Sequence, residues 1–117
     1  MAANNDLTAD YVRQILDYNP ETGELRWKAR TPDMFENIGR PAEWRCRNWN
    51  SLYAGKVAGY GDGTGYLEVR CPNERVKAHR LAWIWMTGAW PAADIDHINL
   101  DRSDNRFANL RQATRTQ

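Results

Sequence analysis

A polar segment near the end of the chain places the strongest constraint on its fold. Residues 99–106 consist largely of Asn, Asp and Ser, whose side chains hydrogen-bond nearby backbone groups and hold turns in one shape. The short apolar run Ile95-Asp96-His97-Ile98 precedes this loop, and a second run begins at Leu110. The pattern predicts two short strands, the second over residues 110–114, joined by a long ordered loop.

Asp96 and His97 are the side chains of this segment best suited to chemistry. Consecutive side chains of a regular strand point to opposite faces, so a regular strand separates these two. A bulge or a strand end would be needed to bring both to one site. The sequence leaves both arrangements open.

Residues 79–88 are predicted to form an apolar helix at the centre of the core. Leu81, Ile84 and Trp85 recur at helical spacing, and Gly88 is a natural stop. His79 begins this helix. A histidine in that place is most often structural and bonds backbone or a cap, and contact with a phosphate group is the alternative.

The N-terminal part is predicted to contain a helix followed by a turn and a strand. Residues 9–17 form the helix, with Thr8 as its cap. Residues 19–23, Asn-Pro-Glu-Thr-Gly, form the turn, and residues 24–28 alternate polar and apolar as a half-buried strand does. In an alternative arrangement residues 16–18 pair with that strand as a hairpin.

Three further short strands are predicted at residues 56–58, 66–70 and 75–78. The Gly-rich residues 59–65 form a flexible loop that lacks the Gly-Lys-Ser/Thr ending of a phosphate-binding loop. Residues 71–74 form a hairpin turn. The predicted fold class is therefore α+β, with an N-terminal helix and hairpin, a small antiparallel sheet and a central apolar helix.

Residues 29–53 combine structure-breaking residues with Arg, Asn and Trp, which predicts an ordered loop or a short helix. Trp44 and Trp49 are interleaved with Arg45 and Arg47. These side chains could form a surface for nucleic acid through stacking and cation–π contacts. The preferred interpretation is a cap whose Trp side chains plug the core while the Arg side chains stay in water.

The length of 117 residues suits one domain with a single core. Residues 1–65 would hold the N-terminal helix, hairpin and Arg/Trp-rich segment, and residues 66–117 the C-terminal motif region. No apolar run approaches the ~20 residues that cross a bilayer, and the first residues do not resemble a signal peptide. We therefore expect a cytoplasmic protein in which Cys46 and Cys71 are free thiols.

Cysteine and histidine content argues against structural zinc, because a Cys2His2 site would use both cysteines and both histidines, His97 included. The net charge of +1 is not that of a strongly basic nucleic-acid-binding protein. Residues 1–69 carry eight basic and ten acidic side chains, or −2, whereas residues 70–117 carry eight and five, or +3. Since local clusters of Arg and Lys bind phosphate, the C-terminal half could still hold a polyanion.

The C-terminal half contains four motifs in order. They are Ala78-His79-Arg80-Leu81-Ala82-Trp83, Asp96-His97-Ile98-Asn99, Asp101-Arg102-Ser103-Asp104-Asn105-Arg106 and Asn109-Leu110-Arg111. Asn105 follows His97 by eight residues and Asn109 follows it by twelve. Together the motifs resemble the HNH endonuclease family, and its small phage-borne and homing-type members most of all. The resemblance spans about residues 66–117, and residues 11–28 are similar to the leading segment of the phage proteins.

The resemblance implies a ββα-metal motif that hydrolyses a DNA phosphodiester bond with one divalent cation, Mg²⁺ or alternatively Mn²⁺. It implies that His97 is the general base, that Asp96 ligates the cation, and that Asn105 braces the loop that positions His97. A neutral imidazole can accept a proton at cellular pH, and carboxylate oxygens suit Mg²⁺. The side chains implied to contact double-stranded DNA are His79, Arg80, Arg102, Arg106, Arg111 and Arg115.

Two features depart from the family pattern. Leu100 stands where many relatives have Gly, so a bulky side chain occupies a turn that favours positive φ. The family's closing helix, which carries the second metal ligand, would begin near Thr114 and continue past Gln117, so we expect the motif to lack most of that helix.

The alternative function is a catalytically impaired HNH-derived domain that binds DNA or a host or phage protein. We expect a monomer.

Overall fold

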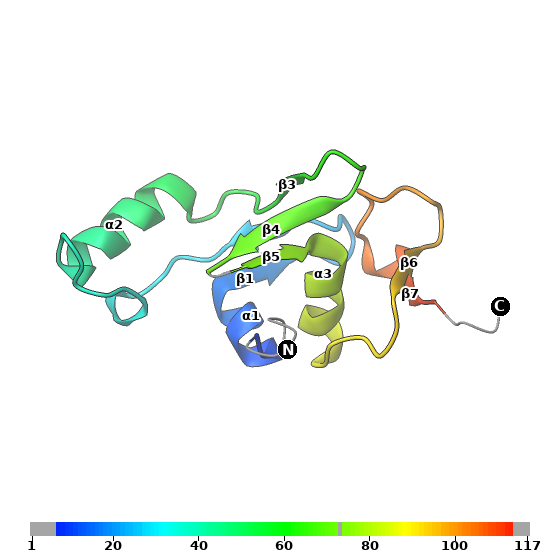
Figure 1. Cartoon of the computed structure of the whole chain (residues 1–117), viewed down its shortest axis with the longest axis horizontal. Helices are drawn as coiled ribbons and strands as arrows, with labels where there is room; N and C mark the ends of the chain where they lie inside the picture. Colours follow the sequence, from blue (N-terminus) through cyan, green and yellow to red (C-terminus); the bar gives the residue numbers. More distant parts are fainter. Residues whose placement is uncertain (1–6, 73, 114–117) are drawn as a thin grey trace.

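The computed structural model describes residues 7–72 and 74–113 and has an α+β architecture (Figure 1). Its α-helices are α1 (Ala9–Ile15), α2 (Ala42–Tyr53) and α3 (Ala78–Thr87). Its strands are β1 (Leu16–Tyr18), β2 (Leu25–Trp27), β3 (Tyr60–Gly61), β4 (Leu67–Cys71), β5 (Glu74–Lys77), β6 (Ile95–His97) and β7 (Leu110–Gln112). Short 3₁₀ helices are η2 (Pro32–Met34) and η3 (Phe107–Asn109). The strands pair antiparallel in the orders β1-β2, β3-β4-β5 and β6-β7, which confirms the predicted class.

The N-terminal helix is shorter than predicted. Thr8 caps it as expected, because the Tyr11 backbone N–H donates to Thr8 Oγ1 at 3.1 Å. The helix ends at Ile15, and residues 16–18 form β1 opposite β2. The prediction of helix to residue 17 is therefore wrong, and the hairpin alternative is confirmed. Leu16 and Tyr18 share one face of β1, and both are buried.

The sheet β3-β4-β5 corrects a second prediction. Residues 56–58 do not form a strand, although Val57 makes an isolated bridge to Arg26 of β2. The strand before β4 is instead Tyr60–Gly61, inside the segment predicted as a flexible loop. Backbone bonds from Ala58 and to Lys56 tie the earlier segment to the edge of β2. The predicted hairpin turn is confirmed, since β4 and β5 pair next to it.

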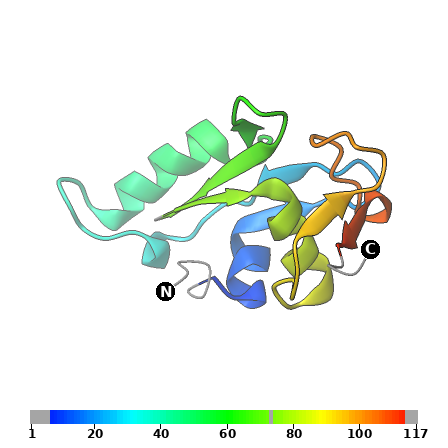
Figure 2. The same ribbon diagram turned by 45° about the vertical axis from the view of Figure 1, so that its right-hand side comes forward.

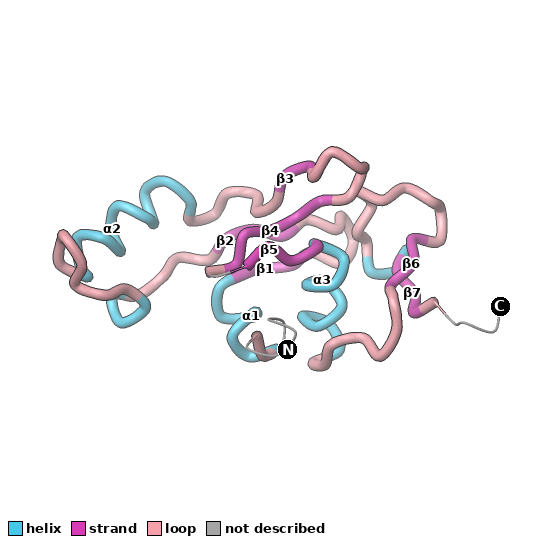
Figure 3. The backbone as a smooth tube through the Cα atoms, in the orientation of Figure 1, coloured by secondary structure: helices cyan, strands magenta, loops and turns pink. Residues whose placement is uncertain are grey.

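Helix α3 lies at the centre of the core, as predicted. Leu81, Ala82 and Ile84 are buried and belong to the same hydrophobic cluster as residues from α1, β1, β4 and β7. Gly88 ends the helix with φ of 84°, a left-handed conformation that costs glycine little. Figure 3 shows α1 and α3 beside the strands of the central part of the molecule.

Helix α2 extends to one end of the molecule, whereas β6 and β7 lie toward the other end (Figures 1 and 2). Its only buried residue is Cys46. Trp44 is 38% exposed and lies under the Arg40 guanidinium, so the interpretation that both Trp side chains plug the core is wrong. Five positions along a helix rotate a side chain by about 140°, which puts Trp44 and Trp49 on different faces. Trp49 packs on Trp27, whose ring contacts the core.

Cys46 and Cys71 are both buried and free, which confirms the prediction of free thiols. Within the described ranges, no helix has both the length and the apolar character needed to cross a membrane.

Candidate functional site

Strand β6 sends its side chains alternately to two faces. Ile95 and His97 are buried, whereas the Asp96 side chain is 43% exposed. The register is unbroken, with Asp96 opposite Arg111 and His97 opposite Leu110. The regular strand is therefore the arrangement that occurs, and Asp96 and His97 lie on opposite faces.

His97 is hydrogen-bonded to Asn105 from the far side of the loop. The two side chains are 4% and 2% exposed, and His97 Nε2 lies 2.9 Å from Asn105 Oδ1. An amide oxygen only accepts, so this contact fits a ring whose Nε2 carries the proton, and in the neutral ring Nδ1 then keeps its lone pair. The bond fixes both the orientation of the imidazole and the tautomer that leaves one nitrogen basic.

Two further rings surround His97. The His79 ring centroid lies 5.0 Å from that of His97, and the Tyr66 ring lies 5.4 Å from His79 and 6.0 Å from His97. Burial, followed by the neighbouring His97, lowers the pKa of His79 to about 4, and its Nδ1 has no hydrogen-bond partner. A neutral, buried imidazole attracts phosphate weakly, which argues against a phosphate contact. The backbone or cap bond expected of a structural histidine is not made by Nδ1 either. Sequence reasoning missed Tyr66, since an aromatic residue beside a strand carries no distinctive signal.

Asn and Asp side chains hold the loop after β6, as its composition predicted. Asn109 Nδ2 donates to Asn99 Oδ1 at 2.9 Å and to the Asp104 backbone carbonyl at 2.8 Å. Asn99 donates in turn from its backbone N–H to Asn109 Oδ1 and from its amide to Asp104. Asn109 is buried, so this network fixes the loop without an apolar core beneath it.

The β1–β2 hairpin contacts residues 105–107 at the end of the same loop, and sequence reasoning missed this contact. The Tyr18 hydroxyl donates to the Asn105 backbone carbonyl at 2.5 Å, and burial strongly raises the pKa of this phenol. Gly23 packs against the backbone of residues 105 and 106, where a Cβ atom would lie only 2.6 Å from Arg106 N. The Phe107 backbone N–H also donates to the Pro20 carbonyl at 3.0 Å. No local pattern links these residues, because they meet only in the folded chain.

Leu100 keeps the positive φ that the family's glycine favours at this turn, although it carries a bulky side chain. Its φ is 67°, in the left-handed region, and its side chain is 84% exposed. The Leu100 N–H donates to the His97 carbonyl at 3.0 Å, which closes the turn directly after the histidine.

The family model described as HNH endonuclease matches residues 76–117, a range that includes β6, the loop and the His97–Asn105 pair. The C-terminal segment belongs to the HNH endonuclease family. Comparisons with curated proteins and with solved structures gave no match.

Two arginines of the HNH segment are held by aromatic or backbone groups. Arg102 Nη1 donates to the Thr64 carbonyl at 2.8 Å, and its guanidinium carbon lies 4.9 Å from the centroid of the Tyr66 ring. The guanidinium of Arg80 lies 5.4 Å from the centroid of the Trp90 ring. Neither contact neutralises the charge, so both arginines can still attract an anion.

Two other arginines of the HNH segment pair with carboxylates. Arg106 Nη2 lies 2.7 Å from Asp104 Oδ2, and Arg111 Nη2 lies 3.2 Å from Asp96 Oδ2. The hydrogen bonds from Arg106 hold the pKa of Asp104 well below its usual range. The Arg111–Asp96 pair is the more exposed, where an ion pair is weak and a phosphate group can exchange for the carboxylate. The Asp104 side chain is 17% exposed and accepts two side-chain hydrogen bonds from Arg106, so that pair is held more firmly. Arg115 lies outside the described residues.

The described part of the HNH segment does not by itself complete a cation site. Across residues 7–72 and 74–113, no group of three or more His, Cys, Asp or Glu side chains converges to hold a metal. Asp96 supplies one carboxylate, but it is paired with Arg111 and lies on the opposite face from the His97 ring. The predicted closing helix, from about Thr114, falls outside the described residues.

Proposed function

We propose that the protein is a metal-dependent HNH DNA endonuclease that hydrolyses phosphodiester bonds, as a nickase or as a double-strand cutter, of phage or mobile-element type. Its C-terminal segment belongs to a family of endonucleases. The observation that carries the proposal within this chain is the buried bond between His97 Nε2 and Asn105 Oδ1. It leaves a nearly buried imidazole with one basic nitrogen, which is what a general base requires.

In this proposal His97 Nδ1 accepts the proton of the water that attacks the phosphorus atom. Asn105 does not touch the substrate, and it positions His97 by accepting the hydrogen bond from Nε2. The positive charge that His97 acquires is then shared with the amide oxygen, which stabilises the protonated ring. The network around Asn109 keeps the two residues at their spacing during the reaction.

HNH endonucleases generally use a divalent cation, which stabilises charge on the phosphate group when it is bound. The proposed cation is Mg²⁺, with Mn²⁺ as the alternative, and Asp96 is the proposed ligand. The proposed substrate is double-stranded DNA. Arg80 and Arg102 are the proposed backbone contacts, joined by Arg106 and Arg111 once phosphate displaces their carboxylate partners.

A plasmid-nicking assay with Mg²⁺ or Mn²⁺ tests the proposal. We expect the wild-type protein to convert supercoiled DNA to the open-circular or linear form, and we expect EDTA and His97→Ala to abolish the conversion. Arg26→Ala, which removes an exposed arginine of β2, serves as the control and should cleave normally. Equal background cleavage by wild type and His97→Ala would show that the catalytic role of His97 is wrong.

A second function is favoured by the Asp96–Arg111 ion pair, which occupies the one carboxylate proposed for the cation. In that case the protein is a catalytically impaired HNH-derived domain that binds DNA or a host or phage protein. DNA binding that weakens steeply with salt, without metal-dependent cleavage, would identify this function with DNA as the partner.

A further inference from the structure

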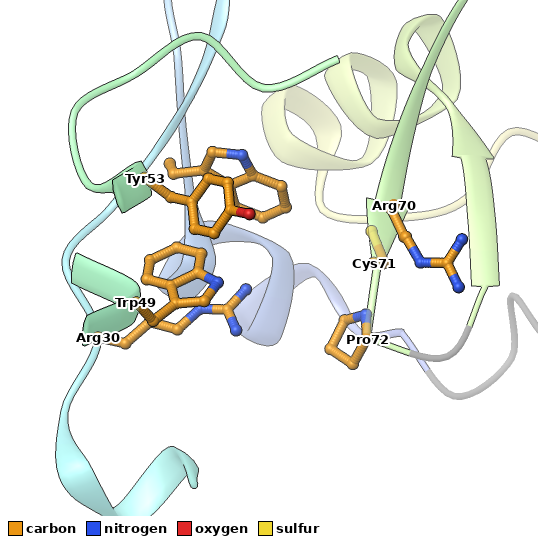
Figure 4. A pocket seen from close by; sticks show the side chains of 7 residues that line it. Arg30, Trp49, Tyr53, Arg70, Cys71 and Pro72 are labelled. Atoms are coloured by element: carbon orange, nitrogen blue, oxygen red, sulfur yellow. The ribbon is translucent and has the colours of Figure 1, made fainter. Parts of the chain in front are cut away.

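A pocket of about 400 Å³ lies between α2, β2 and the end of β4, in a part of the molecule that the family match does not cover (Figure 4). Its volume falls within the range of roughly 300–1,000 Å³ that small-ligand sites occupy. Three aromatic side chains, Trp27, Trp49 and Tyr53, form one wall. Arg70, Cys71 and Pro72 lie across from them in Figure 4. Burial raises the pKa of the Cys71 thiol to about 11, so it contributes a neutral surface and no nucleophile.

The Arg30 guanidinium gives this pocket a positive charge, and among the residues that the structure describes it forms no salt bridge with a carboxylate. The Arg70 side chain lies at the edge of the pocket and points away from the aromatic wall (Figure 4). Arg30 Nε is buried without a hydrogen-bond partner, and burial lowers the pKa of this guanidinium. An unpaired donor out of contact with water costs free energy, and an anion in the pocket would recover it.

Arg30 is fixed in place before any ligand binds. Its backbone N–H donates to Asn50 Oδ1 at 2.8 Å, and Asn50 Nδ2 donates back to the Arg30 carbonyl at 3.0 Å. Its guanidinium carbon lies 3.8 Å from the centroid of the Trp49 ring. A charge held this way binds a ligand without losing much side-chain entropy, as expected of a preorganised binding site.

The exposed Tyr53 side chain provides a surface for a flat ring, since the Arg30 guanidinium and Tyr53 itself cover the Trp49 ring (Figure 4). The Trp49 and Tyr53 ring centroids are 5.3 Å apart with their planes tilted by 44°, and Tyr53 remains 45% exposed. A ligand that satisfies both halves of the pocket therefore needs a planar ring and an anionic group. A nucleotide has both.

We propose that this pocket binds one unpaired nucleotide of a DNA strand, with the base against Tyr53 and a phosphate group at Arg30. The choice of DNA over other nucleotide sources rests on the proposed function. The pocket adds a second DNA contact outside the HNH segment, and a displaced single strand has the unstacked bases that it needs.

Strand β4 connects this pocket to the HNH site. Tyr66, directly before β4, contacts the His79 and His97 rings, whereas Arg70 and Cys71 at the other end line the pocket. At about 3.3 Å per strand residue, these ends are separated by roughly 17 Å, a span that a few nucleotides of one strand can cover. One DNA strand can therefore reach both sites.

Fluorescence anisotropy with a labelled oligothymidylate, in EDTA to prevent cleavage, tests the proposal. Arg30→Gln and Tyr53→Ala each remove one half of the recognition. Gln keeps part of the side chain that packs on Trp49, Tyr53 is exposed, and urea unfolding verifies that both variants fold. Arg26→Ala and Tyr60→Ala are the matched controls, since Arg26 is an exposed arginine outside the pocket and Tyr60 is 45% exposed like Tyr53. We expect each pocket variant to weaken binding about fivefold or more and each control by less than about twofold.

A second probe separates base from phosphate. A strand of the same length with abasic sites keeps every phosphate, so wild type should bind it several-fold more weakly, and Tyr53→Ala should no longer distinguish the two strands. Unchanged affinity in both pocket variants would overturn the proposal. Competition by inorganic phosphate or poly-glutamate as effective as that by thymidine monophosphate would overturn it too, because the pocket would then be a bare anion site.

The outcome is separable from that of the proposed function. If wild type cleaves plasmid DNA while the pocket variants bind like wild type, only the pocket proposal fails. If no variant cleaves but the affinity differences appear, the pocket proposal stands without the nuclease.

Discussion

Replacing Asn105 with alanine removes the acceptor that holds His97. Asn105 is 2% exposed and its bond to His97 Nε2 is 2.9 Å long, so the variant leaves a buried N–H without a partner and a small cavity beside it. An unsatisfied buried donor costs about 1–3 kcal/mol, and we expect a total loss of about 2–3 kcal/mol in the free energy of unfolding. For a chain of 117 residues this corresponds to a fall in Tm on the order of 10 °C.

The same variant separates positioning from binding. Misorientation of a catalytic group by about 1 Å can cost on the order of 100-fold in rate, so kcat should fall by about that factor. DNA affinity should change by less than about twofold, because so little of the Asn105 side chain reaches the surface.

Urea unfolding, plasmid cleavage and DNA anisotropy measure the three quantities. Asn48→Ala is the control, since Asn48 is an exposed Asn of α2 whose loss should change the free energy of unfolding by less than about 0.5 kcal/mol. If Asn105→Ala unfolds and cleaves like wild type, Asn105 has no positioning role. If its DNA affinity falls as much as its kcat, the effect is on binding, and the reasoning is refuted in the same way.

Two other perturbations test the supports of the site. Gly23→Ala places a Cβ atom 2.6 Å from Arg106 N at a φ of 82°, whereas Gly39→Ala has a similar φ of 72° with open space around it. Both variants should lose about 1–2 kcal/mol of the free energy of unfolding because alanine disfavours the left-handed backbone conformation. Urea unfolding should show that Gly23→Ala loses about 1–3 kcal/mol more than Gly39→Ala, because of the clash. Equal losses in the two variants would contradict the close packing of Gly23. His79 titrates near pH 4 when folded and near ~6.5 when unfolded, so the unfolded chain takes up its proton first as the pH falls. Stability should therefore be full above about pH 6.5 and fall toward pH 4, and urea unfolding of His79→Gln should show a flatter decline; an identical decline in the variant would exclude His79 as the cause.

Local patterns in the sequence predicted the elements whose residues interact with near neighbours. Helix α3 follows from the spacing of Leu81, Ile84 and Trp85, and the turn-forming side chains of residues 99–106 do hold that loop. The predictions that proved wrong concern segments whose structure depends on distant partners. Residues 16–18 leave the helix because β2 pairs with them.

Helix α2 is another element whose surroundings depend on residues far away in the sequence. Its composition predicted an ordered loop or a short helix, and the helix is the outcome. Composition could not show which side chains of α2 are buried, because other elements of the fold cover Trp49 and leave Trp44 in solvent. The pocket beside it joins residues from β2, α2 and β4, so no stretch of sequence contains it.

The sequence by itself determined the family of the C-terminal segment, because the spacing of His97, Asn105 and Asn109 can be read directly from the order of the residues. It also determined that a regular strand would separate Asp96 from His97, since alternation is built into extended backbone. Only the tertiary structure decided that this strand is regular, that Asp96 is paired with Arg111, and that Tyr18 and Gly23 support the loop from the other end of the chain. These contacts join residues far apart in sequence, and chain folding alone brings them within bonding distance.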